Sequence, residues 1–279
     1  MKLSLITINL NHANGLKQTI ESVLCQCFKD YEFIVIDGGS TDNSIEVINQ
    51  YADRITYWTS EPDAGIYNAM NKGLRSAQGE YVYFLNSGDR LYSPGTLTSI
   101  FSGNLYTEDL LYGDAARTDG PKGARIVQQP EKLSVARFFN IGICHQASFY
   151  KQELFDSLGF YDETLKIAAD WDFNLRVLLA RRSTRHLPFL VVHYEGSGIS
   201  VAQSDLSSRE KEIILTRHLP EAVYQDYLRL QFLEKECGRL KQFEDWTEQI
   251  RNRNVWANIA MVLCWFLRKL KRNVARWPH

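Results

Sequence analysis

The first hundred residues alternate between two hydrophobic patterns, and this alternation constrains the fold more than any other feature. Short β-type runs occupy 3–8, 31–37, 55–60 and 79–87, and stretches with apolar residues at helical spacing lie between them. Strands that alternate with helices along a chain form parallel sheets with helices on both faces. We therefore predict an α/β fold with a mostly parallel central sheet.

Polar side chains recur at or just after the end of each predicted strand. They are Asn9, Asp37, Glu61, Asp63, Asn86 and Asp89. Asp and Asn are common turn residues, so each position alone is a weak sign. Ligands of open α/β sheets bind in the crevice at the carboxyl ends of the strands. The recurrence therefore predicts a binding site at this edge of the sheet.

The rest of the chain changes character twice. Residues 93–205 mix strand-like and helix-like segments, with a loop rich in Gly and Pro over 120–134 as a candidate flap, and the chain is helical after 205. We predict one domain over 1–205, with a first half at 1–92 and a second at 93–205. A helical extension follows over 206–279.

The predicted extension has two features that need a partner surface. Its apolar stripe consists of Val223, Tyr227, Leu230, Leu233, Cys237, Leu240 and Phe243. This stripe fits packing against the sheet domain and also self-association into a homo-oligomer. The apolar run over 255–267 has 13 residues, fewer than the roughly 20 that span a bilayer.

The last segment of the chain is basic. Residues 251–279 contain seven Lys or Arg and no Asp or Glu, together with Trp256, Trp265 and Trp277. This composition fits the boundary between lipid headgroups and acyl chains, so attachment to a membrane surface and a plain buried helix are both open.

Composition narrows the partners and the compartment. The formal net charge of −1 gives no reason to expect nucleic-acid binding. The five cysteines form no CxxC pair, which indicates reduced thiols in a cytoplasmic protein. If the basic segment 251–279 attaches to a membrane, the protein would be peripheral on the inner face of the cell membrane. The N-terminus lacks the apolar region of a signal peptide and reads as the first strand.

Four segments, at 3–26, 31–44, 60–89 and 162–179, resemble successive motifs of the family 2 glycosyltransferases of the GT-A fold. The resemblance covers roughly residues 2–200, about seven tenths of the chain, and lies nearest the bacterial enzymes of surface-polysaccharide biosynthesis. It implies a nucleotide-binding half joined to an acceptor-binding half. It also implies inverting, metal-dependent hexosyl transfer from a UDP- or GDP-sugar to a hydroxyl of a glycan or lipid-linked acceptor.

The loop "NSGD" resembles the metal-binding motif of this family, in which two aspartates are separated by one residue. Asp89 would be the ligand of Mg²⁺ or Mn²⁺, while Asn86 and Gly88 stand where many relatives have aspartates. One carboxylate remains in the loop, so the cation would depend more on phosphate oxygens. His193 could approach the metal or the pyrophosphate, although a histidine at a strand end is often structural.

Other matched positions imply a nucleotide site. The implied residues are Thr7, Asn9, Asp37, Asp63, Lys72 and Asn86. Asp37 would accept a hydrogen bond from the base of the nucleotide, and it could also cap the next helix. Lys72 would offer its charge to the diphosphate, although relatives often place an arginine about two residues earlier, where this chain has Met70.

The segment "AADWDFNLRVL" resembles the one that supplies the catalytic base, which places Asp170 in that role. Inverting transfer needs a group that removes the proton from the acceptor hydroxyl. His145 and Gln146 resemble residues that face the donor sugar or the acceptor, and a buried structural histidine is the alternative. Trp171 could stack on a sugar ring or pack in the core.

Three other functions deserve comparison. A nucleotidyltransferase would normally have a glycine-rich phosphate loop after the first strand, and "TINLNHANGL" has none. A glycoside hydrolase also uses paired carboxylates, but the nucleotide-pocket pattern would then be unexplained. The reduced metal loop favours a non-catalytic binder of sugar nucleotides or an assembly partner, whereas Asp89 and Asp170 together argue against it.

Overall fold

The N-terminal half has the predicted alternation of strands and helices. The structure, a computed structural model, describes residues 1–118, 123–196 and 203–251. The elements of this half are β1 (Leu3–Asn9), α1 (Ala13–Leu24), β2 (Tyr31–Asp37), α2 (Ser44–Gln50), η1 (Ala52–Arg54), β3 (Tyr57–Ser60), α3 (Ile66–Ser76) and β4 (Tyr81–Phe84). Each predicted strand is present, and a helix follows each of the first three.

The second half carries mixed elements, again as predicted. They are β5 (Arg90–Leu91), α4 (Thr96–Phe101), β6 (Leu110–Thr118), β7 (Ala124–Val127), α5 (Val135–Ile141), η3 (His145–Ala147), β8 (Ser148–Lys151), α6 (Gln152–Leu158), α7 (Ala169–Leu179), β9 (Thr184–Glu195) and α9 (Ser204–His218). The loop predicted over 120–134 is wrong in part, because β7 forms within it by antiparallel pairing with β6.

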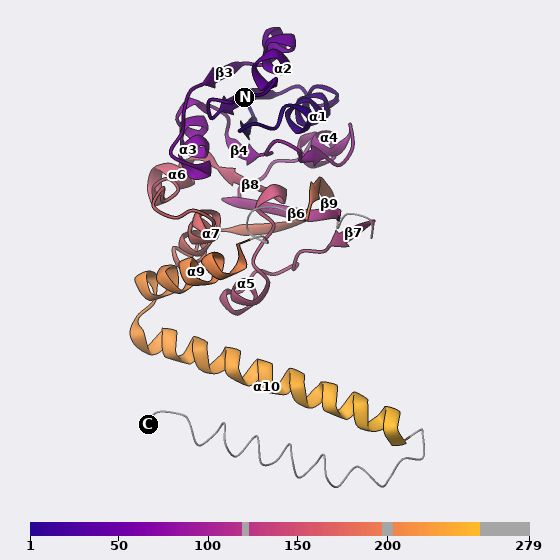
Figure 1. Cartoon of the computed structure of the whole chain (residues 1–279), viewed down its shortest axis with the longest axis vertical. Helices are drawn as coiled ribbons and strands as arrows, with labels where there is room; N and C mark the ends of the chain where they lie inside the picture. The colour runs from indigo at the N-terminus through magenta and orange to yellow at the C-terminus, as the bar shows by residue number, and fades with distance from the viewer. Residues whose placement is uncertain (119–122, 197–202, 252–279) are drawn as a thin grey trace. The chain divides into compact units, whose positions relative to one another are not determined.

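All described strands belong to one sheet (Figure 1). Its order is β3-β2-β1-β4-β8-β6-β9-β5, with β7 paired to β6 outside this path. The first four strands are parallel, whereas β8 is antiparallel to β4 and to β6. The sheet is therefore parallel in the N-terminal half and mixed beyond it.

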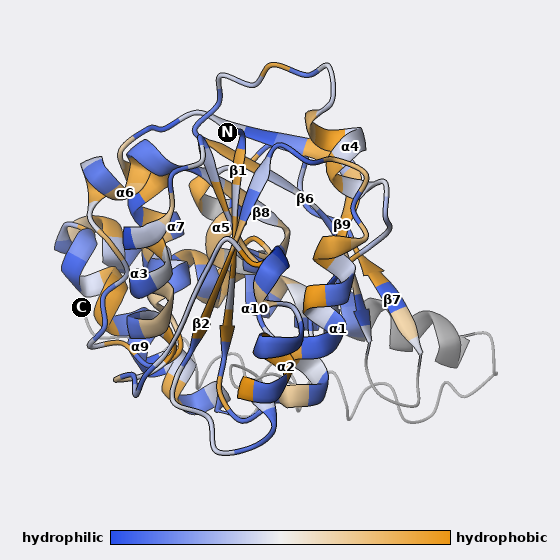
Figure 2. Ribbon diagram, turned by 90° about the horizontal axis from the view of Figure 1, so that it is seen from above, coloured by the Kyte–Doolittle hydropathy of each residue, from blue (hydrophilic) through white to orange (hydrophobic). Residues whose placement is uncertain are grey.

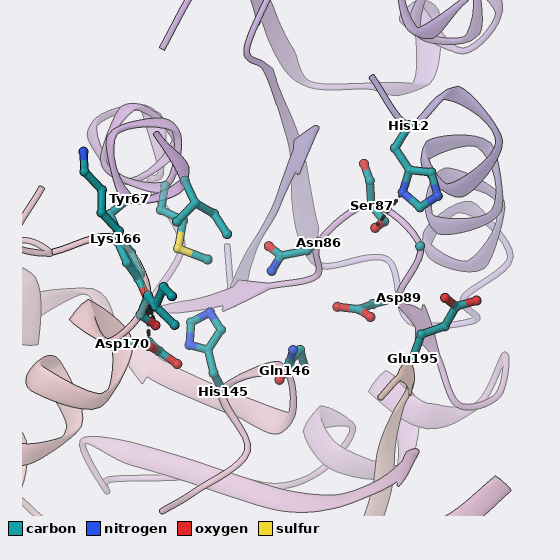
Figure 3. A pocket seen from close by; sticks show the side chains of 14 residues that line it. His12, Tyr67, Asn86, Ser87, Asp89, His145, Gln146, Lys166, Asp170 and Glu195 are labelled. Atoms are coloured by element: carbon teal, nitrogen blue, oxygen red, sulfur yellow. Dashed lines mark hydrogen bonds between the residues drawn. The ribbon is translucent and has the colours of Figure 1, made fainter. Parts of the chain in front are cut away.

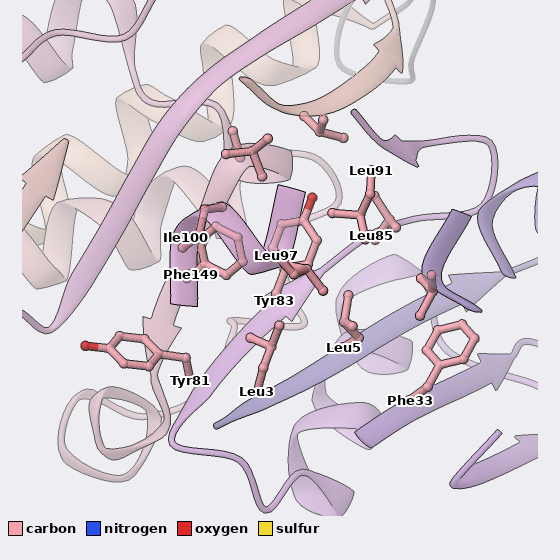
Figure 4. Close-up of a cluster of buried hydrophobic side chains, with 14 of the residues drawn as sticks. Leu3, Leu5, Phe33, Tyr81, Tyr83, Leu85, Leu91, Leu97, Ile100 and Phe149 are labelled. Carbon is pink, nitrogen blue, oxygen red and sulfur yellow. The ribbon is translucent and has the colours of Figure 1, made fainter. Parts of the chain in front are cut away.

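The core lies on both faces of this sheet, and apolar residues line its strands (Figure 2). On one face, Leu3 and Leu5 of β1 and Tyr83 of β4 meet Leu97 and Ile100 of α4 (Figure 4). On the other face α3 packs on β1 and β2. There, a Cβ added at Gly73 would lie 2.5 Å from Cγ2 of Ile6, so only glycine permits this close approach.

The chain divides into two units, Met1–His218 and Leu219–His279. In the second unit, α10 spans Glu221–Arg251 as one long helix. Val223, Leu230, Leu233 and Leu240 of the predicted apolar stripe are exposed on it. Among the described residues, no helix is long and apolar enough to cross a bilayer. Most of the basic segment 251–279 lies outside the described residues.

Candidate active site

The carboxyl ends of the first strands meet at one edge of the sheet, as the sequence predicts. Asn9 of β1 lies opposite Asp37 of β2, and Asp37 lies opposite Ser60 of β3. The segment Asn86–Asp89 leaves the adjacent strand β4 at the same edge. Register thus gathers polar groups from four strands.

A cavity of about 410 Å³ opens at this edge and joins the two halves of the sheet domain (Figure 3). Its lining residues are His12, Ile66, Tyr67, Met70, Asn86, Ser87, Gly88, Asp89, His145, Gln146, Lys166, Ile167, Asp170 and Glu195. Asp89 and Asp170, which are far apart in the sequence, therefore line one cavity. Asn86, His145 and Gln146 line it as well.

The loop that carries Asp89 is fixed by helix α1. The hydroxyl of Thr19 donates to the carbonyl of Asp89 at 2.7 Å and accepts from the backbone N–H of Gly88 at 3.0 Å. Gly88 has φ of +99°, and a Cβ there would lie 2.9 Å from Cε1 of His12. A side chain at 88 would be strained and crowded. The loop geometry therefore disfavours a carboxylate at 88, one of the two positions where the resembled motif has aspartates.

A second carboxylate, that of Glu195 at the end of β9, also lines the cavity. Antiparallel pairing places Arg90 of β5 opposite His193 of β9, which brings Glu195 beside the loop. Burial, and then the charge of Glu195, raise the pKa of Asp89 to about 7. No described residue forms an ion pair with either carboxylate. This arrangement suits a cation that takes oxygen ligands.

Asp170 lies in the first turn of α7 on the opposite side of the cavity (Figure 3). The hydroxyl of Tyr67 on α3 lies 2.9 Å from Oδ1 of Asp170 and 2.6 Å from the carbonyl oxygen of Ile167. Its single O–H proton is shared between these two acceptors, and the contact with Oδ1 holds the carboxylate toward α3. Asp172, two residues on, instead contacts Arg176 at 2.9 Å and His218 at 2.7 Å inside the fold.

His145 is 6% exposed, and neither ring nitrogen has a partner among the described residues. Its ring stacks on Phe84 with centroids 5.5 Å apart. Burial lowers the pKa of His145, although the charge of Asp170 opposes this change. Oδ1 of Asn86 and Oγ of Ser87 are also buried without a partner. Buried polar groups are normally paired, so their concentration here points to a polar ligand.

Some of the predicted nucleotide residues line an adjoining cavity of about 300 Å³. Asn9, Asp63 and Asn86 line it, together with His12 and Ser87, which both cavities share. Asp37 and Thr7 lie behind this surface. The carboxylate of Asp37 accepts hydrogen bonds from Asn9, Gly39, Ser40 and Ser60. Burial alone would raise the pKa of Asp37, but the hydrogen bonds outweigh burial and the pKa is lowered. Thr7 donates to the carbonyl of Leu85.

Besides Thr7 and Asp37, three predicted residues line neither cavity. Lys72 pairs with Glu61 at 2.8 Å. Trp171 is 9% exposed and stacks on Phe138. Nε2 of His193 lies 2.9 Å from the hydroxyl of Thr118. These contacts fit structural roles for the three residues, and their functional roles stay predictions.

Sequence reasoning missed four titratable lining residues, His12, Tyr67, Lys166 and Glu195. Tyr67 belongs to the motif "AGIYNAMN" and could have been found there. Lys166 lies in the segment before Asp170 and supplies a positive charge. Glu195 gives no local signal, because only the pairing of β5 with β9 brings it to the loop.

Comparison with known proteins agrees with this geometry. Residues 4–103 match the model of "Glycosyl transferase family 2". A PGL/p-HBAD biosynthesis glycosyltransferase of Mycobacterium bovis is 33% identical over 202 residues, which cover 70% of this chain and 77% of the relative. An uncharacterized glycosyltransferase of Mycobacterium tuberculosis is 37% identical over 183 residues, covering 63% and 69%.

Solved structures share the fold. The structure of Staphylococcus aureus TarS 1–349 in complex with UDP-GlcNAc superimposes with a TM-score of 0.65 at 20% identity, over 82% of this chain and 70% of that one. The mannosyltransferase PcManGT of Pyrobaculum calidifontis, in complex with GDP-Man and Mn²⁺, gives 0.52 at 17% identity, over 69% and 56%. With two carboxylates across one cavity on this sheet, the chain belongs to glycosyl transferase family 2 and has the GT-A fold.

Proposed function

We propose that this glycosyltransferase moves a hexose from a UDP- or GDP-sugar to an acceptor hydroxyl with inversion of the anomeric carbon. The observation that carries the proposal is the single cavity lined by Asp89 on one side and Asp170 on the other. An inverting transfer needs a leaving diphosphate and an incoming hydroxyl on opposite sides of one carbon. Asp89 would lie beside the leaving diphosphate, and Asp170 would lie beside the incoming hydroxyl.

The leaving diphosphate would lie at the Asp89 side. Asp89 and Glu195 offer carboxylate oxygens, and the unpartnered oxygens of Asn86 and Ser87 lie in the same loop. This donor set fits Mg²⁺ or Mn²⁺, which take few protein ligands when phosphate and water supply the rest. Among the described residues there is no group of three His, Cys, Asp or Glu side chains that could hold a metal alone. When bound, the cation would neutralise charge on the leaving phosphate.

The proton of the acceptor hydroxyl would pass to Asp170. The hydroxyl of Tyr67 donates to Oδ1, so Oδ2 is the oxygen left to accept a proton. The unpartnered nitrogens of His145 offer one donor and one acceptor to hydroxyls of the donor sugar or the acceptor. Its lowered pKa supports the neutral imidazole that this role needs.

Relatives support the class of donor and acceptor. TarS and PcManGT have been solved with UDP-GlcNAc and with GDP-Man and Mn²⁺, respectively. The Mycobacterium bovis relative is named for PGL/p-HBAD biosynthesis. We propose a glycan or lipid-linked acceptor in cell-surface polysaccharide biosynthesis, reached from the cytoplasmic side with the basic segment 251–279 at the membrane surface.

A panel of UDP- and GDP-sugars, with membrane lipid extract as acceptor and with Mn²⁺ or excess chelator, tests the proposal. Release of nucleoside diphosphate and labelling of lipid should require the cation. Asp89→Ala and Asp170→Asn should each lower turnover by at least about a hundredfold, as losses of charge stabilisation and of a general base do.

The outcomes separate the alternatives. Nucleotide binding without turnover for any donor and acceptor would favour a non-catalytic binder, which the reduced metal loop also allows. Full activity in excess chelator would show that the transfer does not need a divalent cation. Undiminished transfer by Asp170→Asn would show that Asp170 is not the general base.

A further inference from the structure

A buried carboxylate from helix α9 contacts the backbone that leads into Asp170. Glu210 is 5% exposed. Its Oε1 accepts from the N–H of Lys166 at 2.7 Å, and its Oε2 accepts from the N–H groups of Ile167 and Ala168 at 2.9 Å each. Among the described residues, no Lys or Arg forms an ion pair with Glu210. Three backbone donors therefore compensate its charge.

The start of α7 needs such a partner. The first N–H groups of a helix have no acceptor within the helix, and a side chain usually supplies one. Here the residue at the N-cap is Ala168, which has no side-chain acceptor. Glu210 supplies oxygens from another helix to the N–H groups of the N-cap residue Ala168 and of the two residues before it, and so fixes the chain where it enters the helix. Hydrogen bonds to a carboxylate are about twice as strong as neutral ones, and negative charge is favourable at this end of a helix.

The same segment forms one wall of the cavity. Lys166, Ile167 and Asp170 all line it. The carbonyl of Ile167 also accepts from the hydroxyl of Tyr67, which donates to Asp170 as well. Glu210 and Tyr67 thus hold opposite sides of the peptide groups at 166–168, and the carboxylate of Asp170 follows within one helical turn.

We propose that Glu210 is a positioning residue for sugar transfer, which fixes the segment 166–168 and thereby the place of the Asp170 carboxylate. This inference rests on the proposed function, because it assigns Glu210 an effect on the step that Asp170 performs. Glu210 itself touches no substrate. Its removal should leave donor binding intact and slow the transfer, since a base displaced by about 1 Å can cost a hundredfold in rate.

A purely structural role predicts a different result. Glu210 would then only add stability, and a variant that remains folded at the assay temperature would keep its kcat. The test therefore needs one readout of the local backbone and one of the chemical step. Asp205, exposed at the start of the same helix, provides a matched control for the loss of one negative charge on α9.

The experiment compares the wild type, Glu210→Gln and Asp205→Asn as full chains. Glu210→Gln keeps the shape but turns an NH₂ group toward a backbone N–H. Hydrogen exchange read by mass spectrometry on peptides over 160–170 should be at least tenfold faster in Glu210→Gln than in the wild type. Its kcat should fall by about tenfold to a hundredfold while KM for the donor and Kd for the free nucleoside diphosphate change less than twofold. Asp205→Asn should match the wild type in all four quantities.

Each contrary outcome is decisive. Unchanged exchange over 160–170, or faster exchange with unchanged kcat, overturns the positioning role while the proposed function stands. No transfer by the wild type overturns the proposed function and the positioning role with it. If Glu210→Gln does not fold, Glu210→Asp, which keeps the charge but is one methylene shorter, serves in the same assays.

Discussion

At the scale of single residues, backbone conformation decides which side chains the active site can carry. Gly88 has a positive φ and its Cα faces His12, so a carboxylate at 88 would meet both strain and a clash. A carboxylate from a distant strand, that of Glu195, lines the same cavity because β5 pairs with β9. The loop departs from the resembled motif, and two acids, Asp89 and Glu195, line the side of the cavity where we propose that the diphosphate binds.

Tyr67→Phe tests how the base is held. The variant removes the hydroxyl that donates to Asp170 and to the carbonyl of Ile167. A hydrogen bond to a charged group is worth about 1.5–3 kcal/mol, so kcat should fall by about tenfold or more. Donor KM should stay within twofold. Tyr92→Phe, whose side chain is exposed at the surface, is the control and should behave as the wild type. Equal rates for both variants would mean that Tyr67 does not orient the base.

The burial of His145 predicts a dependence of stability on pH. Burial lowers its pKa from the ordinary value of 6.5, so below pH 6.5 the unfolded chain binds a proton that the folded chain does not. Stability is therefore lost as pH falls through that value. The contribution between pH 6.5 and 5.5 is up to about 1 kcal/mol in the free energy of unfolding.

Urea denaturation of the wild type and of His145→Gln at these two pH values measures the contribution. The wild type should lose more stability than the variant over this interval. An equal loss in both proteins would show that His145 takes up its proton in the folded state as readily as in the unfolded one.

The sequence predicted Asp89, Asp170, Asn86, His145 and Gln146, and the structure places all five on one cavity. Asn86 and Asp89 follow a strand that hydrophobic pattern predicts, whereas the roles of Asp170, His145 and Gln146 came from the family resemblance. Trp171 follows Asp170 directly but packs on Phe138 instead, because adjacent residues of a helix face different directions. Glu195 depends on a pairing between distant segments, and no local pattern reports it.

At the scale of elements, the parallel half of the sheet was predictable because each strand carries its own hydrophobic signal. The run 31–37 is apolar for most of its length and forms β2, buried on both faces. The strands β5 and β7 have two and four residues, and they exist because longer strands pair with them. Neither β5 nor β7 is a buried apolar run, so hydrophobic periodicity does not reveal them.

Gly73→Ala tests the packing of α3 on the sheet. A Cβ at 73 would lie 2.5 Å from Ile6, so α3 must shift. Overpacking of this kind costs about 1–3 kcal/mol in the free energy of unfolding, more than alanine gains over glycine in a helix. Because α3 carries Tyr67 and faces both cavities, turnover should fall as well.

Gly238→Ala is the matched control for this experiment. Gly238 lies in the helix α10, with no atom within 4 Å of an added Cβ. The substitution should leave stability unchanged or raise it by up to about 1 kcal/mol. Urea denaturation followed by circular dichroism compares the two variants. A stable Gly73→Ala protein would show that α3 has room at this position.

At the scale of the whole molecule, the two units have different proposed roles. Residues 1–218 contain the sheet, both cavities and the helix that holds the base segment. Residues 219–279 carry a long helix with exposed leucines and the basic segment 251–279. The first unit thus contains the whole proposed catalytic apparatus, and the second is a candidate for placing it near a lipid-linked acceptor.

Deletion of residues 252–279 tests the membrane expectation. Each Lys or Arg near an anionic surface contributes about 1 kcal/mol of attraction, so the full chain should sediment with vesicles that contain phosphatidylglycerol. The truncated chain should bind them at least tenfold more weakly, and high salt should release the full chain. Donor hydrolysis by the truncated chain should be unchanged. Equal binding of both chains to the vesicles would contradict a role for this segment.

We propose that one cavity holds a nucleotide sugar with its diphosphate beside Asp89 and its anomeric carbon facing Asp170. A crystal structure of the full chain with Mn²⁺ and the donor selected by the panel measures this arrangement directly. We expect the cation to contact a carboxylate oxygen of Asp89, and an open path to lead from the anomeric carbon to Oδ2 of Asp170. A donor bound outside the cavity, or a diphosphate on the Asp170 side, would contradict it.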